Sequence, residues 1–373
     1  MKMKTIYFFA SFGNLKKLPG GGGETSARRL LGVLRKMGYD VHIFNRHRKY
    51  FENRLLDRIS MATFVMIDPI LYFFYLLFKK RKNAATLYIG YTGTILRFDY
   101  MITKVTSMLG FRNMMYLKGG KARWAYEKGS PSYQKLFAKM MQMYDEVMTE
   151  GYENMALVKS VAPQTKTFYL PNYTENGFAP SELPKRTHDE INIFYFGRID
   201  AEKNVLLSVA VFNELCKKYN NLHLTIVGGG NSEYIKRVEQ AIANSPYKDR
   251  ITKEGRSSHE RICEIMKSQH FFIFPSNEPC EGHSNAMNEA MSWGLVPVVS
   301  SNNFLPSIVG DERLVAKDFE VQSFVRIFEE IIDNNMIDEL SRKMYDRVKE
   351  NFTQSVVECS LAQELIQFFN IKQ

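Results

Sequence analysis

The chain lacks several patterns by which common classes of protein are recognised. Its four cysteines lie far apart and form no C-x-x-C pair, which excludes a disulfide framework and a cysteine-type zinc site and fits a reducing compartment. No D-x-D triplet occurs, so the usual carboxylate pair for a nucleotide-bound divalent metal is missing. There is no H-E-x-x-H motif, no G-x-S-x-G elbow and no P-loop. The chemistry must therefore come from other residues.

Long hydrophobic runs are scarce as well. The longest, residues 64–78, contains Asp68 and Pro69 and stays below the roughly 18 apolar residues of a transmembrane helix. The N-terminal MKMKTIYFFASFGN has a short apolar run that leads into Gly- and Lys-rich sequence and not into a small-residue cleavage site. We interpret it as a first buried strand, and we expect a cytoplasmic protein.

What the chain does have is the composition of a soluble globular protein of two domains. Its 373 residues are 45% hydrophobic and 24% charged. The net charge of +10 is unevenly spread: residues 1–175 carry 28 Lys and Arg against 12 Asp and Glu, whereas residues 176–373 carry 22 against 28. The basic half suggests contact with phosphate groups, a membrane surface or nucleic acid, and the alternative is a solvated basic surface without a partner.

The first half reads as alternating strands and helices. The order strand, Gly-rich loop (Gly20–Gly23), helix, strand is that of a right-handed βαβ unit, which predicts a parallel sheet covered by helices. The expected strands are Thr5–Ala10, Val41–Phe44, Thr86–Gly90 and Asn113–Leu117, and the expected helices are Glu24–Met37 and Tyr100–Leu109.

The same pattern restarts after a Pro- and Asn-rich boundary at residues 170–186. We therefore predict two consecutive α/β domains, each a doubly wound sheet that binds ligands at the carboxyl ends of its strands, facing each other across a cleft. The expected strands are Ile191–Phe196, Leu222–Val227, His270–Phe274 and Val296–Val299, and the expected helices are Asn204–Tyr219, Asn285–Ser292 and a last one at Gln354–Phe369.

The richest stretch is Phe274–Ser300, in which a buried strand leads through a polar loop into a short helix. Ser284 or Asn285 can cap that helix, and its first N–H groups together with Gly282 would form an anion site. Glu281 and Glu289 can both face the cleft, where a carboxylate suits the vicinal hydroxyls of a sugar or ribose. The alternative is that both are solvated surface residues.

A second candidate lies at Phe196–Asn204, FGRIDAEKN, another strand end that opens toward a helix. Arg198 and Lys203 could converge there on one anion such as a diphosphate, or Arg198 could form a surface ion pair with Asp200 or Glu202. The Gly20–Gly23 loop fits no G-x-G-x-x-G fingerprint, so NAD binding is not expected.

Together these pieces resemble the retaining glycosyltransferases of family 4, also called glycosyl transferases group 1, across nearly the whole chain. GGGGETSARRLLGVLRKMGYDVHIF is similar to the family's opening Gly-rich loop, helix and second strand, and LPNYTENGF to its interdomain segment. FGRIDAEKN is similar to its G-R-x-x-x-x-K motif, and EGHSNAMNE, continued by EAMSWGLVPVV, to its E-x7-E signature.

The resemblance implies the GT-B fold, with a Rossmann-like acceptor domain at 1–172, a nucleotide-sugar domain at 173–352 and a returning helix at 353–373. It implies a retaining, metal-independent, hexosyltransferase-type enzyme without a cofactor. Such an enzyme moves a sugar from a UDP- or GDP-linked donor to a saccharide or lipid-linked saccharide, as in surface polysaccharide or glycolipid synthesis. A nucleotide-sugar epimerase or phosphorylase of the same fold is the alternative.

The resemblance also implies residue roles. Arg198 and Lys203 would hold the diphosphate, Glu281 the donor sugar and Glu289 the ribose, with Glu281, Arg198 and Lys203 as the catalytic group. The remaining donor contacts would come from Gly22, Gly23, Gly197, Arg256, Gly282, His283, Ser284, Asn285 and Ala286.

Three departures from the family pattern stand out. His283-Ser284 replaces the common Phe-Gly after E-G, the Asn-Gly segment is interrupted as Asn172–Gly177, and Lys118-Gly119-Gly120 stands where many members carry a histidine. We place Lys118 as a cation near donor phosphate or acceptor.

The apolar Phe64–Phe78 followed by Lys79–Lys82 is the one candidate for a membrane-surface element on an anionic inner leaflet. A core-facing helix with a basic cap is an equally good interpretation. Nucleic acid is not expected as a partner, since no recognisable reading module is present.

Overall fold

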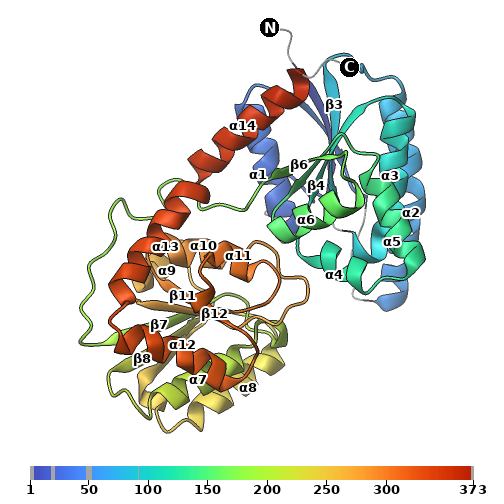
Figure 1. The fold of residues 1–373 in the computed structure, drawn as a ribbon. Coiled ribbons are helices and arrows are strands. Elements are labelled where there is room, and N and C mark those ends of the chain that lie inside the picture. The colour runs from blue at the N-terminus through green and yellow to red at the C-terminus, as the bar shows by residue number, and fades with distance from the viewer. Residues whose placement is uncertain (1–3, 18–21, 48–52, 91, 371–373) are drawn as a thin grey trace. The chain divides into compact units, whose positions relative to one another are not determined.

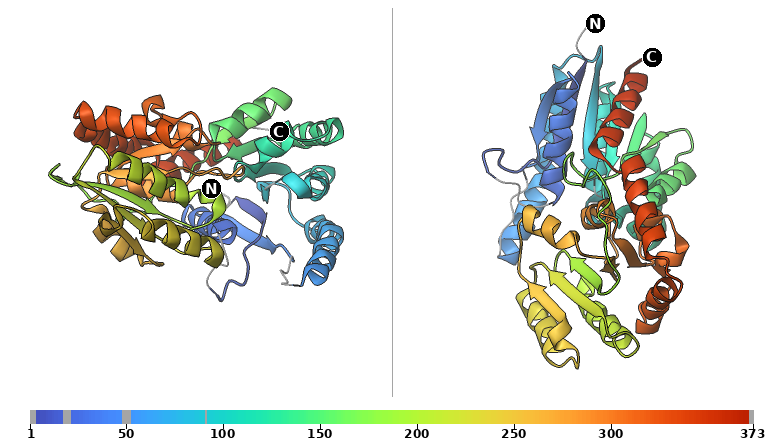
Figure 2. Two further views of the ribbon diagram at one scale, coloured as in Figure 1. Left: turned by 90° about the horizontal axis from the view of Figure 1, so that it is seen from below. Right: turned by 90° about the vertical axis from the view of Figure 1, so that its left-hand side faces the viewer.

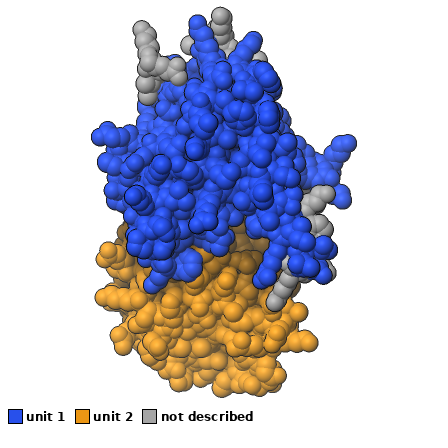
Figure 3. Space-filling view, turned by 90° about the vertical axis from the view of Figure 1, so that its right-hand side faces the viewer, with its two compact units in different colours: residues 1–170, 358–373 blue, residues 171–357 orange. Residues whose placement is uncertain are grey.

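The computed structural model describes residues 4–17, 22–47, 53–90 and 92–370, which form two compact units (Figure 1, Figure 3). Unit 1 comprises Met1–Leu170 and Glu358–Gln373, and unit 2 comprises Pro171–Val357. The ranges expected from the sequence, 1–172, 173–352 and 353–373, differ from these units by a few residues at each boundary. Each unit is an α/β sandwich, and we describe each by itself.

Unit 1 contains a parallel six-stranded sheet in the order β2-β1-β3-β4-β5-β6. The central strands β1 and β3 are almost wholly apolar, as expected for strands that are covered by helices on both faces of the sheet. The bounds of the strands are β1 Thr5–Ala10, β2 Asp40–Asn45, β3 Ala84–Gly90, β4 Arg112–Leu117, β5 Glu146–Thr149 and β6 Lys166–Tyr169.

The helices of unit 1 lie on both faces of this sheet. Helices α2, α3 and α5 lie on one face and α1 on the other (Figure 1, Figure 2). The bounds are α1 Gly22–Lys36, α2 Arg54–Leu77, α3 Leu96–Met108, α4 Lys121–Glu127, α5 Pro131–Met141 and α6 Tyr152–Val161. The last helix, α14 Gln354–Asn370, begins in unit 2, and from Glu358 onward it belongs to unit 1.

Helix α2 has one face in the core of unit 1 and another face exposed, so both interpretations of residues 64–82 apply in part. Phe64, Asp68, Tyr72 and Leu76, spaced four residues apart, are buried in the core of unit 1. On another face Met66, Ile67, Ile70, Leu71, Phe74 and Phe78 are between 42% and 87% exposed. The expectation that no segment reaches the length of a transmembrane helix was wrong by this measure: Leu55–Leu77 is long and apolar enough to cross a membrane by length and composition alone, because the helix extends the apolar run of residues 64–78 back to Leu55.

Unit 2 repeats the architecture with the strand order β12-β11-β10-β7-β8-β9. In chain order this is the Rossmann arrangement, in which the chain reverses direction across the sheet between the first strand, β7, and the fourth, β10. The bounds are β7 Ile191–Phe196, β8 Leu222–Val227, β9 Ile251–Glu254, β10 Phe271–Phe274, β11 Val296–Ser300 and β12 Val315–Ala316.

Helices α7, α8 and α12 lie on one face of the unit 2 sheet, and α9, α10 and α13 on the other (Figure 1). The bounds are α7 Val205–Leu215, α8 Ser232–Ala243, α9 His259–Met266, α10 Asn285–Ser292, α11 Leu305–Val309, α12 Val321–Asp333 and α13 Ile337–Asn351. Both units are thus doubly wound parallel sheets, which confirms the predicted fold class.

Three predicted boundaries were clearly wrong. Helix α3 begins at Leu96, four residues before the predicted start at Tyr100. Helix α1 begins at Gly22, so Gly22 and Gly23 form its first turn and not the loop before it, while Gly20 and Gly21 lie outside the described residues. Helix α7 ends at Leu215, four residues before the predicted end. The lysines and tyrosine at 217–219 permit a helix, but the backbone there turns toward β8.

Candidate functional site

The candidate site of unit 2 lies where the loops after β7 and β10 meet. These two strands are neighbours in the sheet, and both loops leave from their carboxyl ends. Doubly wound sheets bind ligands at this reversal point, because the two loops diverge there and leave space between them. The loop after β7 supplies Arg198 and Lys203, and the loop after β10 supplies Ser276, Glu278 and Glu281.

Lys203 is the centre of this cluster. Its Nζ lies 2.5 Å from Glu278 Oε2 and 2.6 Å from Glu281 Oε2, and only 9% of its side chain is exposed. The backbone holds it there, because the Lys203 N–H donates to Asp200 Oδ1 at 2.9 Å and the next residue, Asn204, adopts a left-handed conformation with φ 54°. The side chain is therefore fixed before any ligand arrives.

Arg198 lies at the rim of the same cluster. Its guanidinium contacts Glu278 at 3.1 Å and Asp200 at 2.8 Å, and 58% of the side chain is exposed. Both sequence-based alternatives are therefore realised: Arg198 pairs with Asp200, and it also converges with Lys203 on one anionic group. In this structure that group is the Glu278 carboxylate.

Glu281 is held from two sides. Besides Lys203, the hydroxyl of Ser276 donates to its Oε2 at 2.6 Å. Burial raises the pKa of Glu281, and the Lys203 ammonium and the Ser276 hydroxyl oppose that rise. Ser276 is itself fixed, because its carbonyl accepts from the Ser300 hydroxyl at 2.6 Å. Glu281 is thus a buried carboxylate and not a solvated surface residue.

Sequence reasoning missed Glu278 and Ser276. Both belong to the loop that was singled out, and the signal was present in the spacing S-x-E-x-x-E directly after a buried strand. Only the fold reveals that Glu278 faces cations from another strand, 75 positions earlier in the chain.

The segment His283–Ala286 leads into α10, which begins at Asn285 as predicted. Ser284 caps the helix, accepting from Met287 N at 3.3 Å, and Asn285 is exposed on the first turn. His283 is buried, and its carbonyl accepts from Asn172 Nδ2 at 2.7 Å, while Asn288 Nδ2 donates to the Asn172 carbonyl at 2.9 Å. Gly282 and Ala286 are half-buried beside them.

Glu289 lies in the second turn of α10 and is half-buried. Burial, and then the Glu289 charge, raise the pKa of Cys263 on α9. The predicted contact of Glu289 with a ribose stays a prediction.

Three glycines bring the loops after β7 and β8 into direct backbone contact. A Cβ on Gly228 would lie 1.9 Å from the Gly197 carbonyl oxygen, and one on Gly230 would lie 2.3 Å from the Ile199 carbonyl oxygen. Gly197 N and Ile199 N donate to Val227 O and Gly229 O at 3.1 and 3.0 Å. This pairing fixes the start of the Arg198 loop.

Arg256 is exposed and follows β9. Its side chain lies beside Gly229, where an added Cβ would be 2.8 Å from Arg256 Cγ. It therefore borders the glycine loop after β8, and its predicted place near the donor base stays a prediction.

The sites predicted in unit 1 are placed differently. Gly22 and Gly23 start α1, and their predicted approach to a donor stays a prediction. Lys118 is 6% exposed, and it forms an ion pair with buried Glu150 and a hydrogen bond to Tyr116 Oη at 3.2 Å. Its charge is thus balanced inside the protein.

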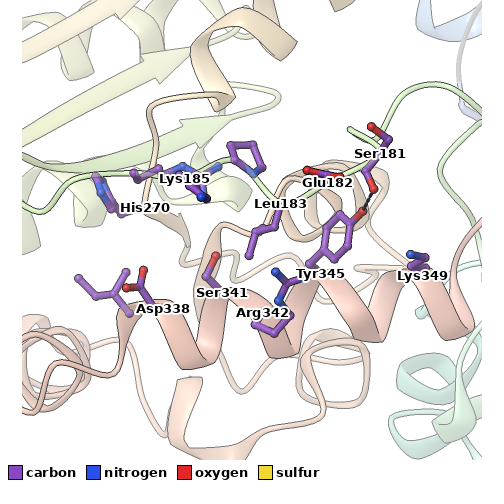
Figure 4. Close-up of a pocket in the computed structure, with 13 residues that line it drawn as sticks. Ser181, Glu182, Leu183, Lys185, His270, Asp338, Ser341, Arg342, Tyr345 and Lys349 are labelled. Atoms are coloured by element: carbon purple, nitrogen blue, oxygen red, sulfur yellow. Dashed lines mark hydrogen bonds between the residues drawn. The ribbon is translucent and has the colours of Figure 1, made fainter.

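A cavity of about 740 Å³ in unit 2 lies elsewhere, between residues 181–186 and helix α13 (Figure 4). His270, which lines it, immediately precedes β10 and therefore marks the amino end of the sheet. Two of the cavity's polar side chains are engaged by the protein itself: the Tyr345 hydroxyl donates to the Pro180 and Ser181 carbonyls, and Arg186 donates to those of Met266, Lys267 and Trp293. We do not assign the site there. Among the described residues, no group of three or more His, Cys, Asp or Glu side chains is placed to hold a metal ion.

Comparison with known proteins agrees with the location of the cluster. Residues 181–352 match the model of the family described as glycosyl transferases group 1, and this range contains the whole Arg198–Lys203–Glu281 cluster. Unit 2 is a group 1 glycosyl transferase domain.

Two curated relatives carry corresponding names. The chain is 28% identical to a phosphatidylinositol N-acetylglucosaminyltransferase protein from Arabidopsis thaliana over 181 residues, which are 48% of this chain and 39% of that protein. It is 29% identical to GDP-mannose:cellobiosyl-diphosphopolyprenol alpha-mannosyltransferase from Xanthomonas oryzae pv. oryzae over 108 residues, 29% of this chain and 28% of that protein. The alignments thus span well under half of either relative.

The fold similarity extends over both units. Sucrose-phosphate synthase from Thermosynechococcus elongatus matches with a TM-score of 0.72 at 17% identity, covering 99% of this chain and 100% of that one. At this identity the likeness shows the fold alone, which is the GT-B fold of paired Rossmann-like units.

Proposed function

We propose that this group 1 glycosyl transferase domain uses a nucleotide diphosphate sugar, UDP- or GDP-linked, and that the protein transfers the sugar with retained anomeric configuration. The acceptor is a saccharide or a lipid-linked saccharide. The observation that carries the proposal is the paired cations Arg198 and Lys203, which share one carboxylate oxygen of Glu278 at the reversal point of the sheet. Two cations that converge on one oxyanion suit a diphosphate.

The cluster can perform the chemistry without a metal ion. As the bond between sugar and diphosphate breaks, negative charge grows on the diphosphate, and Arg198 and Lys203 stabilise it by charge and hydrogen bonds. Arg198 offers a planar fork from the rim, and Lys203 a point charge from a fixed, buried position. Glu281, held by Lys203 and Ser276, keeps one carboxylate oxygen for a donor sugar hydroxyl.

We also propose that the protein binds an anionic membrane surface through α2. Met66, Ile70, Phe74 and Phe78 lie along the exposed side of this helix and are 55% to 87% exposed. Four cations, Lys79–Lys82, follow directly. An apolar face beside a cationic cluster is typical of elements that lie in the interface of an anionic bilayer. The names of both relatives contain a lipid, phosphatidylinositol or diphosphopolyprenol, in agreement with such a place.

The donor proposal is tested with purified protein. UDP and GDP are titrated against wild type and Lys203→Met by calorimetry, with Lys218→Met as control, because Lys218 forms exposed ion pairs in the same unit. We expect one diphosphate to bind wild type and the control alike, and about 100-fold weaker binding to Lys203→Met, since a charged hydrogen-bonding group is lost. Equal binding to all three proteins would contradict the assignment.

Product analysis separates the reaction classes. A transferase needs a saccharide or lipid-linked acceptor, whereas an epimerase isomerises the donor without one and a phosphorylase transfers the sugar to inorganic phosphate, which the reaction buffer therefore contains. Donor sugars are incubated with and without a lipid-linked saccharide acceptor, and the anomeric configuration of the product is read by NMR. An isomerised donor without acceptor, or an inverted product, would overturn the proposed reaction.

A further inference from the structure

Unit 1 contains a cavity of about 610 Å³ between the first turns of α3 and α5 and helix α4. Its volume lies within the range usual for ligand sites. Three cations line it, Arg97, Lys121 and Lys128, and no aspartate or glutamate does. In the described part of the chain, none of the three forms an ion pair with a carboxylate.

The neighbouring cations that do not line the cavity form ion pairs with carboxylates. Lys118, three residues before Lys121, pairs with Glu150, and Arg123 pairs with Glu127 at 2.7 Å. Within residues 118–128, the cations that do not line the cavity therefore have carboxylate partners, and those that line it have none. The positive charge that no carboxylate of the described residues balances thus lies at the cavity, where Arg97 and Lys128 are exposed and Lys121 is half-buried.

The backbone around the cavity is fixed. Gly93 has φ +72°, and a Cβ there would lie 2.7 Å from Lys121 Cε, so the lysine stem crosses the turn after β3 because that residue is glycine. The Gly93 N–H donates to the Tyr133 hydroxyl at 3.0 Å. Asp99, fully buried, accepts from the Thr92 N–H at 3.0 Å and from Tyr88. The turn is thus tied to both α3 and α5.

The remaining lining groups suit a sugar. Trp124 is 43% exposed and contributes an aromatic face. Ser130 caps α5, accepting from Tyr133 N at 3.3 Å, and its hydroxyl lies 2.9 Å from that of Ser132. The first turns of α3 and α5 add partial positive charge. A ring face, hydroxyls and unpaired cations together fit a phosphorylated saccharide, with the guanidinium and ammonium groups on the phosphate.

We propose that this cavity of unit 1 binds the phosphate or diphosphate of a glycosyl phosphate, and that the acceptor of the enzyme is of this class. That the bound molecule is the acceptor rests on the proposed function. The binding of a glycosyl phosphate in the cavity rests on the contacts described above. The same chemistry can come from a free sugar phosphate or from a sugar joined to a lipid by a diphosphate.

The experiment measures binding to the full chain by calorimetry at physiological salt. The probes are glucose 1-phosphate, geranyl diphosphate and uncharged glucose, with the nucleoside diphosphate that unit 2 binds, if any, present at saturation. The variant is Arg97→Gln/Lys121→Gln. The matched control is Lys104→Gln/Lys135→Gln. It removes one exposed cation from α3, the helix that carries Arg97, and one from α5, and neither lines the cavity.

We expect at least one phosphorylated probe to bind wild type, and glucose to bind more weakly. We expect about a tenfold or greater loss of affinity in the cavity variant and less than about a twofold change in the control. Binding of glucose 1-phosphate would identify a free sugar phosphate as sufficient, and binding of geranyl diphosphate alone would identify a lipid diphosphate. Absence of binding by either phosphorylated probe, or equal losses in both variants, would overturn the proposal.

Two further measurements, together with the UDP and GDP titrations, keep the outcomes separate. Thermal unfolding of both double variants checks that the exchanges leave the fold intact. Trp124→Ala should weaken glucose 1-phosphate binding and leave geranyl diphosphate binding unchanged, and a loss for both probes would contradict the ring's role. Failure of the proposed function would appear as no binding of UDP or GDP and no effect of Lys203→Met, whatever the cavity binds.

Discussion

Glu278 Oε2 lies 2.5 Å from Lys203 Nζ, and the same oxygen lies 3.1 Å from Arg198. One carboxylate thus occupies the position between two cations where we propose a diphosphate binds. A ligand with two negative oxygens would have to displace Glu278, whose side chain is 20% exposed, whereas Glu281 is held by Ser276 as well and can stay. If a donor diphosphate binds there, Glu278 is the residue with which it competes.

Glu278→Gln should strengthen binding of the nucleoside diphosphate about three- to tenfold, because the neutral amide leaves both cations less satisfied before the ligand binds. Calorimetric titration measures the change. Glu254→Gln is the matched control, since Glu254 also pairs with an arginine of unit 2, at 2.6 Å from Arg261, outside the cluster. Weaker binding in Glu278→Gln would mean that Glu278 positions the cations for the ligand and does not compete with it.

Lys203→Met should destabilise unit 2 by about 1–3 kcal/mol at neutral pH, because Glu281 loses one partner of its buried carboxylate. The loss should shrink toward pH 5. Burial already raises the pKa of Glu281, and without the ammonium the pKa rises further, so the folded protein takes up a proton that the unfolded chain releases. Stability from such a group is fully present at low pH and falls as pH rises. Denaturant unfolding at both pH values measures the loss of stability, with Lys218→Met as the control. A loss that is the same at both pH values would contradict this account.

The loops after β7 and β8 give a steric prediction. Gly228→Ala would place Cβ 1.9 Å from the Gly197 carbonyl oxygen, at φ +156°, so one of two paired backbones must move. We expect a loss of about 2–4 kcal/mol in unfolding free energy, and weaker nucleotide binding because the Arg198 loop starts at Gly197. Gly255→Ala, with no atom within 4 Å of its added Cβ, should change stability by less than about 0.5 kcal/mol. Similar values for the two variants would contradict this packing.

The sequence predicted the bounds of helices and strands better than it predicted which side chains contact each other. Strands β7 and β8 and helix α10 have the bounds that their apolar spacing and the Ser284 cap indicate, because those signals are local. Lys203 was assigned to the site, but its partner Glu278 was not, since nothing local ties a loop after β10 to one after β7. Lys118 was interpreted as a ligand cation, and its partner Glu150 lies 32 residues away on a neighbouring strand's loop. Helix α2 looked ambiguous for a physical reason: it has two apolar faces, one buried and one exposed.

Buried Glu146 and its half-buried neighbour Glu364 in unit 1 predict a second pH dependence. Burial, and then the neighbouring Glu364 of α14, raise the pKa of Glu146 at the start of β5 well above its usual value, with Lys166 opposing the rise. The folded state therefore holds a proton that the unfolded chain has released, and this stabilisation is lost as pH rises through the raised pKa. Glu146→Gln should leave stability unchanged near pH 5 and raise the melting temperature by a few degrees near pH 9. Equal effects at both pH values would exclude titration of Glu146 as the cause, and Glu350→Gln on the exposed side of α13 is the control.

The exposed face of α2 makes the membrane proposal measurable. Ile70→Ser/Phe74→Ser removes two side chains that are 55% and 59% exposed, so the fold should keep its stability while the apolar area available to a bilayer falls. The partition coefficient measured by co-sedimentation with vesicles of phosphatidylglycerol and phosphatidylcholine should drop about 30-fold, since each of the two side chains contributes about 1 kcal/mol when half inserted. The control Phe319→Ser/Ile366→Ser removes similar side chains, 45% and 53% exposed, outside α2. Added salt should weaken wild-type binding through Lys79–Lys82, because exposed cations are screened. If the two double variants co-sediment equally, the protein binds vesicles through its net positive charge, and the membrane proposal for α2 is wrong.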